Sequence, residues 1–101
     1  MIYKNDRRLQ FEMGWRMKAF RSICSLSQRA LADLMEVSQA TIYRWELGQQ
    51  PIDILKLARS AKEINTTTDW IILGSYRGMS DDLVDKLREY MGNHPMPLPA
   101  T

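Results

Sequence analysis

The amino-acid sequence predicts an all-α fold, with five helices and an additional C-terminal helix. Three observations lead to this class. Apolar residues recur at three- and four-residue steps through most of the chain, which is the spacing of one helix face. Serine, a favoured N-cap residue, precedes several of these runs, at Ser27, Ser38 and Ser80. Gly48 follows one of them and can adopt the left-handed backbone that ends a helix.

The first predicted helix extends from about Asp6 to Cys24. Its apolar positions are Leu9, Met13, Met17, Phe20, Ile23 and Cys24. Gly14 inside this run costs about 1 kcal/mol relative to alanine. Two arrangements are therefore open: one continuous helix, which we favour, or a separate short turn over Asp6–Met13. Cys24 is the only cysteine, cannot form an internal disulfide, and favours a reducing cytoplasm.

Residues 27–48 organise the rest of the chain. They predict two short helices that meet at a tight turn around residues 35–37. Leu31, Leu34 and Met35 give the first of these helices its apolar face, and Ile42 and Trp45 give the second helix its own. The second helix thus has one buried edge and one free face.

The free face of that second helix carries an amide, a methyl group, a phenol and a guanidinium, from Gln39, Ala40, Tyr43 and Arg44. Glutamine can bind adenine with two hydrogen bonds, arginine can bind guanine in the same way, and alanine can contact the thymine methyl group. We expect these four residues to read bases in a major groove. The implied partner is double-stranded DNA.

A fourth helix is expected from about Pro51 to Ile64. Its core-facing residues are predicted to be Ile54, Leu55, Leu57, Ala58, Ala61 and Ile64, and Asn65 is expected to end it in a left-handed conformation. Thr67 or Thr68 can cap the fifth helix, over residues 69–73, which ends at Gly74. Trp70 is expected to fill the core.

The C-terminal part is predicted to contain a linker, one amphipathic helix and a tail. Ser80, Asp81 and Asp82 suit the start of a helix, and Gly92 suits its end. Its apolar stripe comprises Leu83, Val84, Leu87, Tyr90 and Met91. The expected units are a DNA-binding domain at 1–74, the linker and helix at 75–92, and a flexible proline-rich tail at 93–101.

Charge and composition favour nucleic acid as the partner. The net charge is +2, but residues 1–62 hold eleven Lys/Arg against six Asp/Glu, whereas residues 63–101 hold three against six. A basic body favours a polyanion. No apolar run approaches the roughly 18 residues of a membrane helix, so no membrane role is expected. With one histidine, one cysteine, no phosphate loop and no metal-ligand spacing, we expect no enzymatic activity, cofactor or metal.

These residues resemble the phage-repressor-like helix-turn-helix family (Cro/cI, XRE) over about Gly14 to Gly74. The resemblance lies in the order and spacing of short motifs: Gly14-Trp15-Arg16-Met17, Arg21, Leu26-Ser27-Gln28, Leu31-Ala32, Val37-Ser38, Thr41-Ile42, Glu46-x-Gly48, Pro51, Ala61 and Asp69 to Gly74. The resemblance implies a five-helix lambda-repressor-like DNA-binding domain with the helix-turn-helix unit at 27–48. The chain departs from the family at Glu36, where glycine is usual. Either Glu36 accepts a left-handed conformation, which costs about 1–2 kcal/mol, or the turn differs.

The resemblance also implies roles for polar residues around the helix-turn-helix unit. Arg21 and Glu46 are expected to form a partly buried ion pair, the alternative being two surface charges. Gln28 is expected to bind phosphate and to brace Gln39, since it also begins a helix whose free N–H groups favour an anion. Further phosphate or positioning contacts are expected from Arg16, Arg29, Ser38, Thr41 and Gln49.

The function expected from this resemblance is that of a cytoplasmic transcriptional regulator, specifically a phage or prophage repressor. It would bind a pseudo-palindromic operator as a dimer. The candidate dimer surface comprises the segment from Trp70 to Leu73 and the stripe Leu83, Val84, Leu87, Tyr90 and Met91; alternatively, that helix folds back on its own domain. A second functional hypothesis is an antitoxin-like protein that holds a toxin through the C-terminal helix. The sequence does not identify the operator, the regulated genes or the sign of regulation.

Overall fold

The computed structural model describes residues 6–63 and 68–97. Within these ranges the chain forms six helices and no strand, which confirms the predicted all-α class. The helices are α1 (Arg7–Ile23), α2 (Gln28–Met35), α3 (Gln39–Glu46), α4 (Ile54–Ala61), α5 (Thr68–Leu73) and α6 (Asp81–Asn93). No helix in the described ranges has the length and apolar character needed to cross a membrane.

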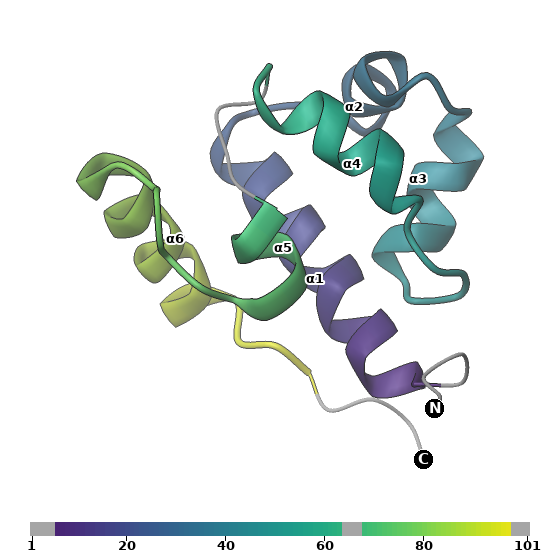
Figure 1. Ribbon diagram of the computed structural model, residues 1–101. Coiled ribbons are helices and arrows are strands. Elements are labelled where there is room, and N and C mark those ends of the chain that lie inside the picture. Colours follow the sequence, from purple (N-terminus) through teal and green to yellow (C-terminus); the bar gives the residue numbers. More distant parts are fainter. Residues whose placement is uncertain (1–5, 64–67, 98–101) are drawn as a thin grey trace.

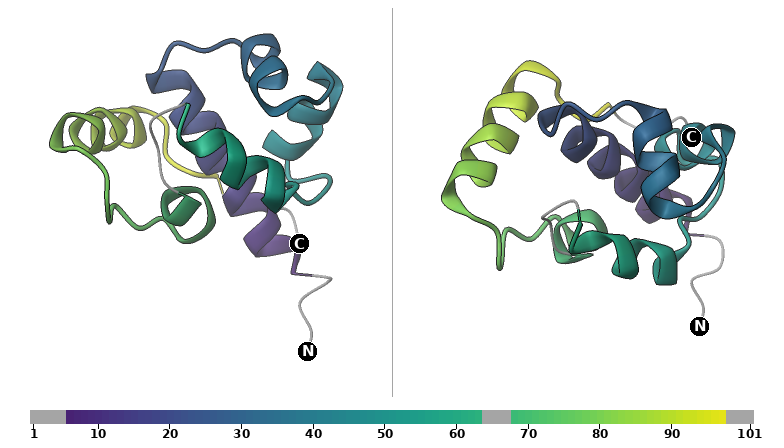
Figure 2. Two further views of the ribbon diagram at one scale, coloured as in Figure 1. Left: turned by 45° about the horizontal axis from the view of Figure 1, so that its top comes forward. Right: turned by 90° about the horizontal axis from the view of Figure 1, so that it is seen from above.

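The first helix, α1, is the centre of the fold. Helices α3, α5 and α6 each pack against it, α2 packs against α3 and α4, and α4 also contacts α5. Figure 1 shows α6 on one side of α1 and α3 on the other, and both views in Figure 2 keep this arrangement. The helix with the predicted base-reading face therefore lies at the edge of the molecule, away from α6.

Side-chain caps start five of the six helices. In each, a serine or aspartate oxygen accepts a hydrogen bond from a backbone N–H three residues later, which satisfies a donor that the helix leaves unpaired. The caps are Asp6 to Leu9, Ser27 to Ala30, Ser38 to Thr41, Asp53 to Lys56 and Ser80 to Leu83. The three serine caps expected from the sequence are confirmed.

The continuous helix predicted for the first segment is also confirmed, because Gly14 lies inside α1 without a break. The reason for glycine here is a helix crossing. A Cβ atom added at Gly14 would lie 2.0 Å from the carbonyl oxygen of Trp45, at the C-terminal end of α3. No atom can occupy that position, so the missing side chain lets α3 approach the backbone of α1 directly.

One apolar core joins all six helices. Its fully buried large side chains are Phe20, Leu31, Met35, Ile42, Leu57, Ile71 and Leu87. Trp70 is also buried and stacks on Tyr76 with ring centroids 5.3 Å apart. Cys24 is half-buried beside this core, and burial raises the pKa of its thiol, an effect that Lys86 partly offsets.

Several helix boundaries differ from the predictions. Helix α4 begins at Ile54 rather than Pro51, because Asp53 caps it in an extended conformation, and it ends at Ala61 rather than Ile64. Helix α5 begins at Thr68, which is its first residue and not its cap. Helix α6 continues through Gly92 to Asn93. The predictions for Ile64, Asn65, Thr67 and residues 98–101 lie outside the described residues.

The prediction that Ile54, Leu55 and Ala58 face the core is wrong. All three are exposed, Leu55 to 83%. Their spacing matches the helix period, but the buried stripe of α4 consists of Leu57, Ser60 and Ala61. The first turn of α4 therefore presents apolar side chains to solvent.

Candidate nucleic-acid interface

Helix α3 has one buried face and one exposed face. Ile42 and Trp45 point into the core and are at most 3% exposed. The four side chains predicted to read bases, Gln39, Ala40, Tyr43 and Arg44, are all exposed. Because α3 lies at the edge of the molecule (Figure 1), this face is open to a large partner. The structure thus brings the four candidates together on one accessible surface.

The N-terminal end of α3 is a compact cluster of hydroxyl groups. The Oγ atom of Ser38 accepts from the backbone N–H of Thr41 at 3.1 Å and lies 2.9 Å from the Oγ1 atom of Thr41. Ser38 is exposed and Thr41 is half-buried. Both hydroxyl groups lie at the N-terminal end of α3. Gln49, just beyond the other end of α3, is exposed as well.

An ion pair ties the C-terminal end of α3 to α1. The guanidinium of Arg21 donates from Nε to Oε2 of Glu46 at 2.6 Å, and from Nη2 to Oε1 at 3.0 Å. Only 3% of the Glu46 side chain is exposed. Arg21 also donates from Nη1 to the carbonyl oxygen of Leu26, 2.9 Å away, in the connection to α2. This geometry, with both carboxylate oxygens engaged, orients α3 relative to the helices behind it.

Gln28 joins this ion pair instead of bracing Gln39. Its Nε2 atom donates to Oε1 of Glu46 at 3.1 Å. The predicted brace is therefore replaced by a contact with the buried carboxylate. The physical reason is that an ionised carboxylate is a stronger acceptor than an amide, and Glu46 needs donors once it is withdrawn from water.

The prediction that Arg16 contacts phosphate is wrong. Arg16 is buried, and its Nη1 atom donates to the carbonyl oxygens of Ile71 at 2.9 Å and Ile72 at 2.8 Å. Its Nη2 atom donates to Glu12, 3.3 Å away. Burial lowers the pKa of the Arg16 guanidinium, an effect that Glu12 opposes. Arg16 is thus a cap for the C-terminal end of α5, whose last carbonyl groups lack helical partners.

Sequence analysis missed the partner of Arg44. The Nε atom of Arg44 donates to Oε1 of Gln50 at 3.1 Å. This bond joins the last turn of α3 to the loop between α3 and α4. This bond uses only Nε, so it does not engage the two terminal amino groups of the guanidinium. Those two groups form a fork that suits guanine. The only signal in the sequence was a polar side chain just after the turn at Gly48.

The turn between α2 and α3 contains a left-handed residue. Glu36 has φ 58° and ψ 45°, so it accepts the conformation that the family usually gives to glycine. Two cations of α4 lie against it: Arg59 is 3.3 Å from its carboxylate, and Lys56 donates to its carbonyl oxygen at 3.5 Å. Since this carboxylate is adjacent to the candidate DNA face, Arg59 reduces the repulsion it would exert on phosphate.

The structure contradicts the predicted dimer surface at Trp70 and Leu87, and the other four residues of the stripe are partly buried. Trp70 and Leu87 are at most 2% exposed within a single copy of the chain. Leu83, Tyr90 and Met91 are half-buried against the same core, and Tyr90 packs on Trp15 with ring centroids 6.2 Å apart. Val84 is half-buried too. The alternative, that α6 folds back on its own domain, describes the structure.

The sequence model of a helix-turn-helix family matches residues 17–71, which span α2 and α3 and parts or all of α1, α4 and α5. Neither the curated proteins nor the solved structures contain a match.

Proposed function

The chain belongs to the phage-repressor-like helix-turn-helix family (Cro/cI, XRE) of DNA-binding transcriptional regulators, and we propose that it is a sequence-specific repressor of the phage or prophage type. The observation that carries this proposal is the exposed face of α3. Gln39 and Arg44, which can each form two hydrogen bonds with a base, lie on it beside Ala40 and Tyr43. A rigid helix at the edge of a small domain is the arrangement that enters a major groove.

Phosphate contacts would surround this base-reading face. Arg29 is exposed on α2, and Ser38, Thr41 and Gln49 lie at the two ends of α3. Gln28 stands at the first position of α2, where backbone N–H groups favour an anion. The excess of basic residues within 1–62 supports a polyanion such as DNA as the partner.

The proposed operator is a pseudo-palindrome bound by two copies. One α3 helix covers only a few base pairs, and two helices about 34 Å apart would read successive major grooves. Selection from a random double-stranded pool should therefore enrich two inverted half-sites about 10 base pairs apart, centre to centre.

The test of base reading is Arg44→Ala, measured by fluorescence anisotropy on the selected duplex and on a scrambled duplex. We expect a loss of about 1–3 kcal/mol in binding free energy on the selected sequence and much less on the scrambled one. Arg29→Ala is the matched control. It should weaken both duplexes alike and lower the salt dependence, the slope of log K on log salt, by about 0.9. A pool with no enriched sequence, or equal losses for Arg44→Ala on both duplexes, would contradict the proposal.

A further inference from the structure

The loop between α3 and α4, residues 47–53, is fixed to the end of α3 by two backbone hydrogen bonds. The N–H of Gln49 donates to the carbonyl oxygen of Arg44 at 2.9 Å, and the N–H of Gly48 donates to that of Trp45 at 3.0 Å. This is the Schellman pattern that ends many helices, with Gly48 in the left-handed conformation at φ 73°. The residue that follows Gln49 is therefore held at a defined place relative to Arg44.

The same loop is also fixed to α1. Gln10 donates from Nε2 to the carbonyl oxygen of Gly48 at 2.8 Å. A Cβ atom added at Gly48 would lie 2.8 Å from the Cα atom of Phe11, so the loop rests directly on the backbone of α1. The first half of the loop is thus attached to two helices.

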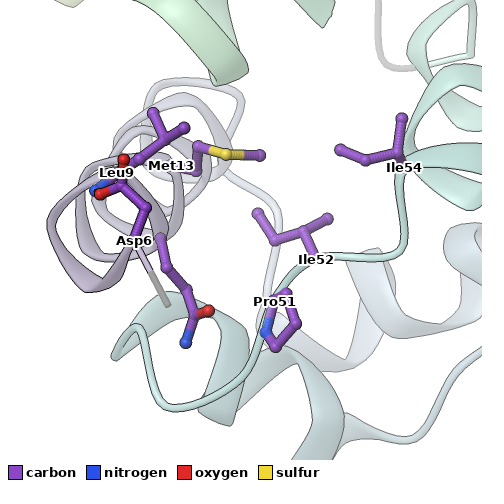
Figure 3. A pocket seen from close by; sticks show the side chains of 7 residues that line it. Asp6, Leu9, Met13, Pro51, Ile52 and Ile54 are labelled. Atoms are coloured by element: carbon purple, nitrogen blue, oxygen red, sulfur yellow. The ribbon is translucent and has the colours of Figure 1, made fainter. Parts of the chain in front are cut away.

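A proline and a buried isoleucine restrain the second half of the loop. Pro51 disfavours the helical conformation for the residue before it, Gln50. Ile52 is only 6% exposed and belongs to the core. Figure 3 shows Pro51 and Ile52 opposite Leu9 and Met13 of α1, with which they line a small pocket. Since the loop is held on both sides, Gln50 extends its side chain from a rigid support.

From this support Gln50 holds one atom of an exposed arginine. Its Oε1 atom accepts from Nε of Arg44 at 3.1 Å. Gln50 is half-buried, whereas Arg44 is exposed and its guanidinium is at the end of a flexible side chain. The remaining N–H donors of the guanidinium are on Nη1 and Nη2, at the tip of that side chain. The bond therefore restrains the guanidinium without using its terminal donors.

We propose that Gln50 is a positioning residue that determines which edge of the Arg44 guanidinium meets DNA and thereby makes Arg44 selective for guanine. The inference rests on the proposed function, in which Arg44 reads a base. With Nε engaged, the two terminal amino groups are the donors left for DNA, and their fork matches the O6 and N7 acceptors of guanine. An arginine without this restraint can also turn toward a phosphate, which carries no sequence information.

Restraint in the free protein should strengthen specific binding more than non-specific binding. Ordering a long side chain at an interface has an entropic cost, which is smaller when the side chain is already restrained. Only a guanine at the matching place benefits, because phosphates can accept from a guanidinium in many orientations. Removing the acceptor should therefore reduce the preference for guanine, and not the affinity for DNA in general.

The experiment compares wild type, Gln50→Leu, Arg44→Ala and the double variant on four duplexes that differ only in the base pair read by Arg44. That base pair is the one at which Arg44→Ala abolishes the preference of wild type. Gln50→Leu removes the acceptor without changing the charge. We expect it to lose about three- to tenfold in affinity for the guanine duplex and less than about twofold for the other three.

The double variant is the control for indirect damage. Once Arg44 is an alanine, Gln50→Leu should have no further effect on any duplex, because the bond it removes no longer exists. A general disturbance of the loop would instead lower the affinity in both backgrounds.

Gln50→Glu tests the role of the acceptor itself. Its carboxylate has the same reach and also accepts from Nε, so the preference for guanine should be retained. Its charge should weaken binding to all four duplexes alike.

NMR relaxation tests the restraint without DNA. In the free protein, the Nε–H group of Arg44 should move more in Gln50→Leu than in wild type. This result does not depend on whether the protein reads a sequence.

The inference would be overturned by an equal loss of affinity on all four duplexes in Gln50→Leu, which would indicate a phosphate contact by Gln50. An unchanged preference for guanine, a preferred base other than guanine, or unchanged motion of Arg44 would overturn it as well. So would a loss of guanine preference in Gln50→Glu as large as in Gln50→Leu. Wild type without any sequence preference would instead refute the proposed function, while the NMR comparison would still report on the bond between Arg44 and Gln50.

Discussion

At the scale of single residues, Gly14 shows how a close approach can reverse a helix preference. Inside a helix, glycine to alanine usually stabilises by about 1 kcal/mol. Here the new methyl group would lie 2.0 Å from the carbonyl oxygen of Trp45, and backbone cannot move aside as a flexible side chain can. We expect Gly14→Ala to destabilise the protein by about 1–3 kcal/mol or more in urea denaturation.

Gly92 provides the control for this substitution. It also lies inside a helix, but a Cβ atom added there meets no atom within 4 Å. Gly92→Ala should raise the free energy of unfolding by up to about 1 kcal/mol. If Gly14→Ala behaved in the same way, α3 would not rest on the backbone of α1 as the structure shows.

Glu36 presents the opposite case, a side chain where glycine would be less strained. Its left-handed backbone costs about 1–2 kcal/mol for a residue with a Cβ atom. Its exposed ion pair with Arg59 is worth only about 0–1 kcal/mol. We therefore expect Glu36→Gly to stabilise the protein by about 1 kcal/mol in thermal or urea denaturation.

Arg59→Met separates the two effects, because it removes the ion pair and leaves the backbone of Glu36 unchanged. Its cost should stay below about 1 kcal/mol. A net loss of stability in Glu36→Gly larger than the loss in Arg59→Met would show that the turn is not strained.

At the scale of helices, the network around Glu46 determines how α3 is held. The carboxylate of Glu46 is nearly inaccessible to water and receives donors from Arg21 and Gln28. Removing the guanidinium leaves this charge buried with one remaining side-chain donor. Arg21→Met should therefore lower the free energy of unfolding by about 3–5 kcal/mol.

The double variant Arg21→Met with Glu46→Leu tests the cause. It removes both charges and keeps apolar volume, so most of the lost stability should return. DNA affinity should return less completely, because a leucine cannot orient α3 through hydrogen bonds. A double variant as unstable as Arg21→Met alone would show that packing, and not the stranded charge, caused the loss.

At the scale of the whole molecule, α6 is a part of the single core. Leu87 is fully buried and Tyr90 packs against Trp15 of α1. Leu87→Ala should cost about 2–5 kcal/mol in urea denaturation, with no change of mass in sedimentation. Val84→Ala, at a half-buried position of the same helix, is the milder control. A folded Leu87→Ala variant with wild-type stability and an altered mass would contradict this assignment.

Much of the fold could be predicted because it depends on contacts within a few residues. Each side-chain cap joins residues three apart, and each apolar stripe repeats at three- and four-residue steps. For the same reason the free face of α3 could be identified: Ile42 and Trp45 are on its apolar edge, and the four polar or small candidates lie on the other side. Family resemblance added the pairing of Arg21 with Glu46, which are 25 residues apart.

What the sequence by itself determined, then, is which serines cap α2, α3 and α6, which residues of α3 share a face, and that this helix carries the candidate DNA face. Only the tertiary structure decided which faces other helices cover. Periodicity assigned Leu55 to the core and Leu87 to an interface between copies, whereas the structure exposes the first and buries the second. Arg16 was predicted to contact DNA, but in the structure its side chain donates to carbonyl oxygens 55 and 56 residues away. The physical reason is that periodicity shows which side chains share a face, whereas burial and hydrogen-bond partners depend on groups brought together from distant parts of the chain.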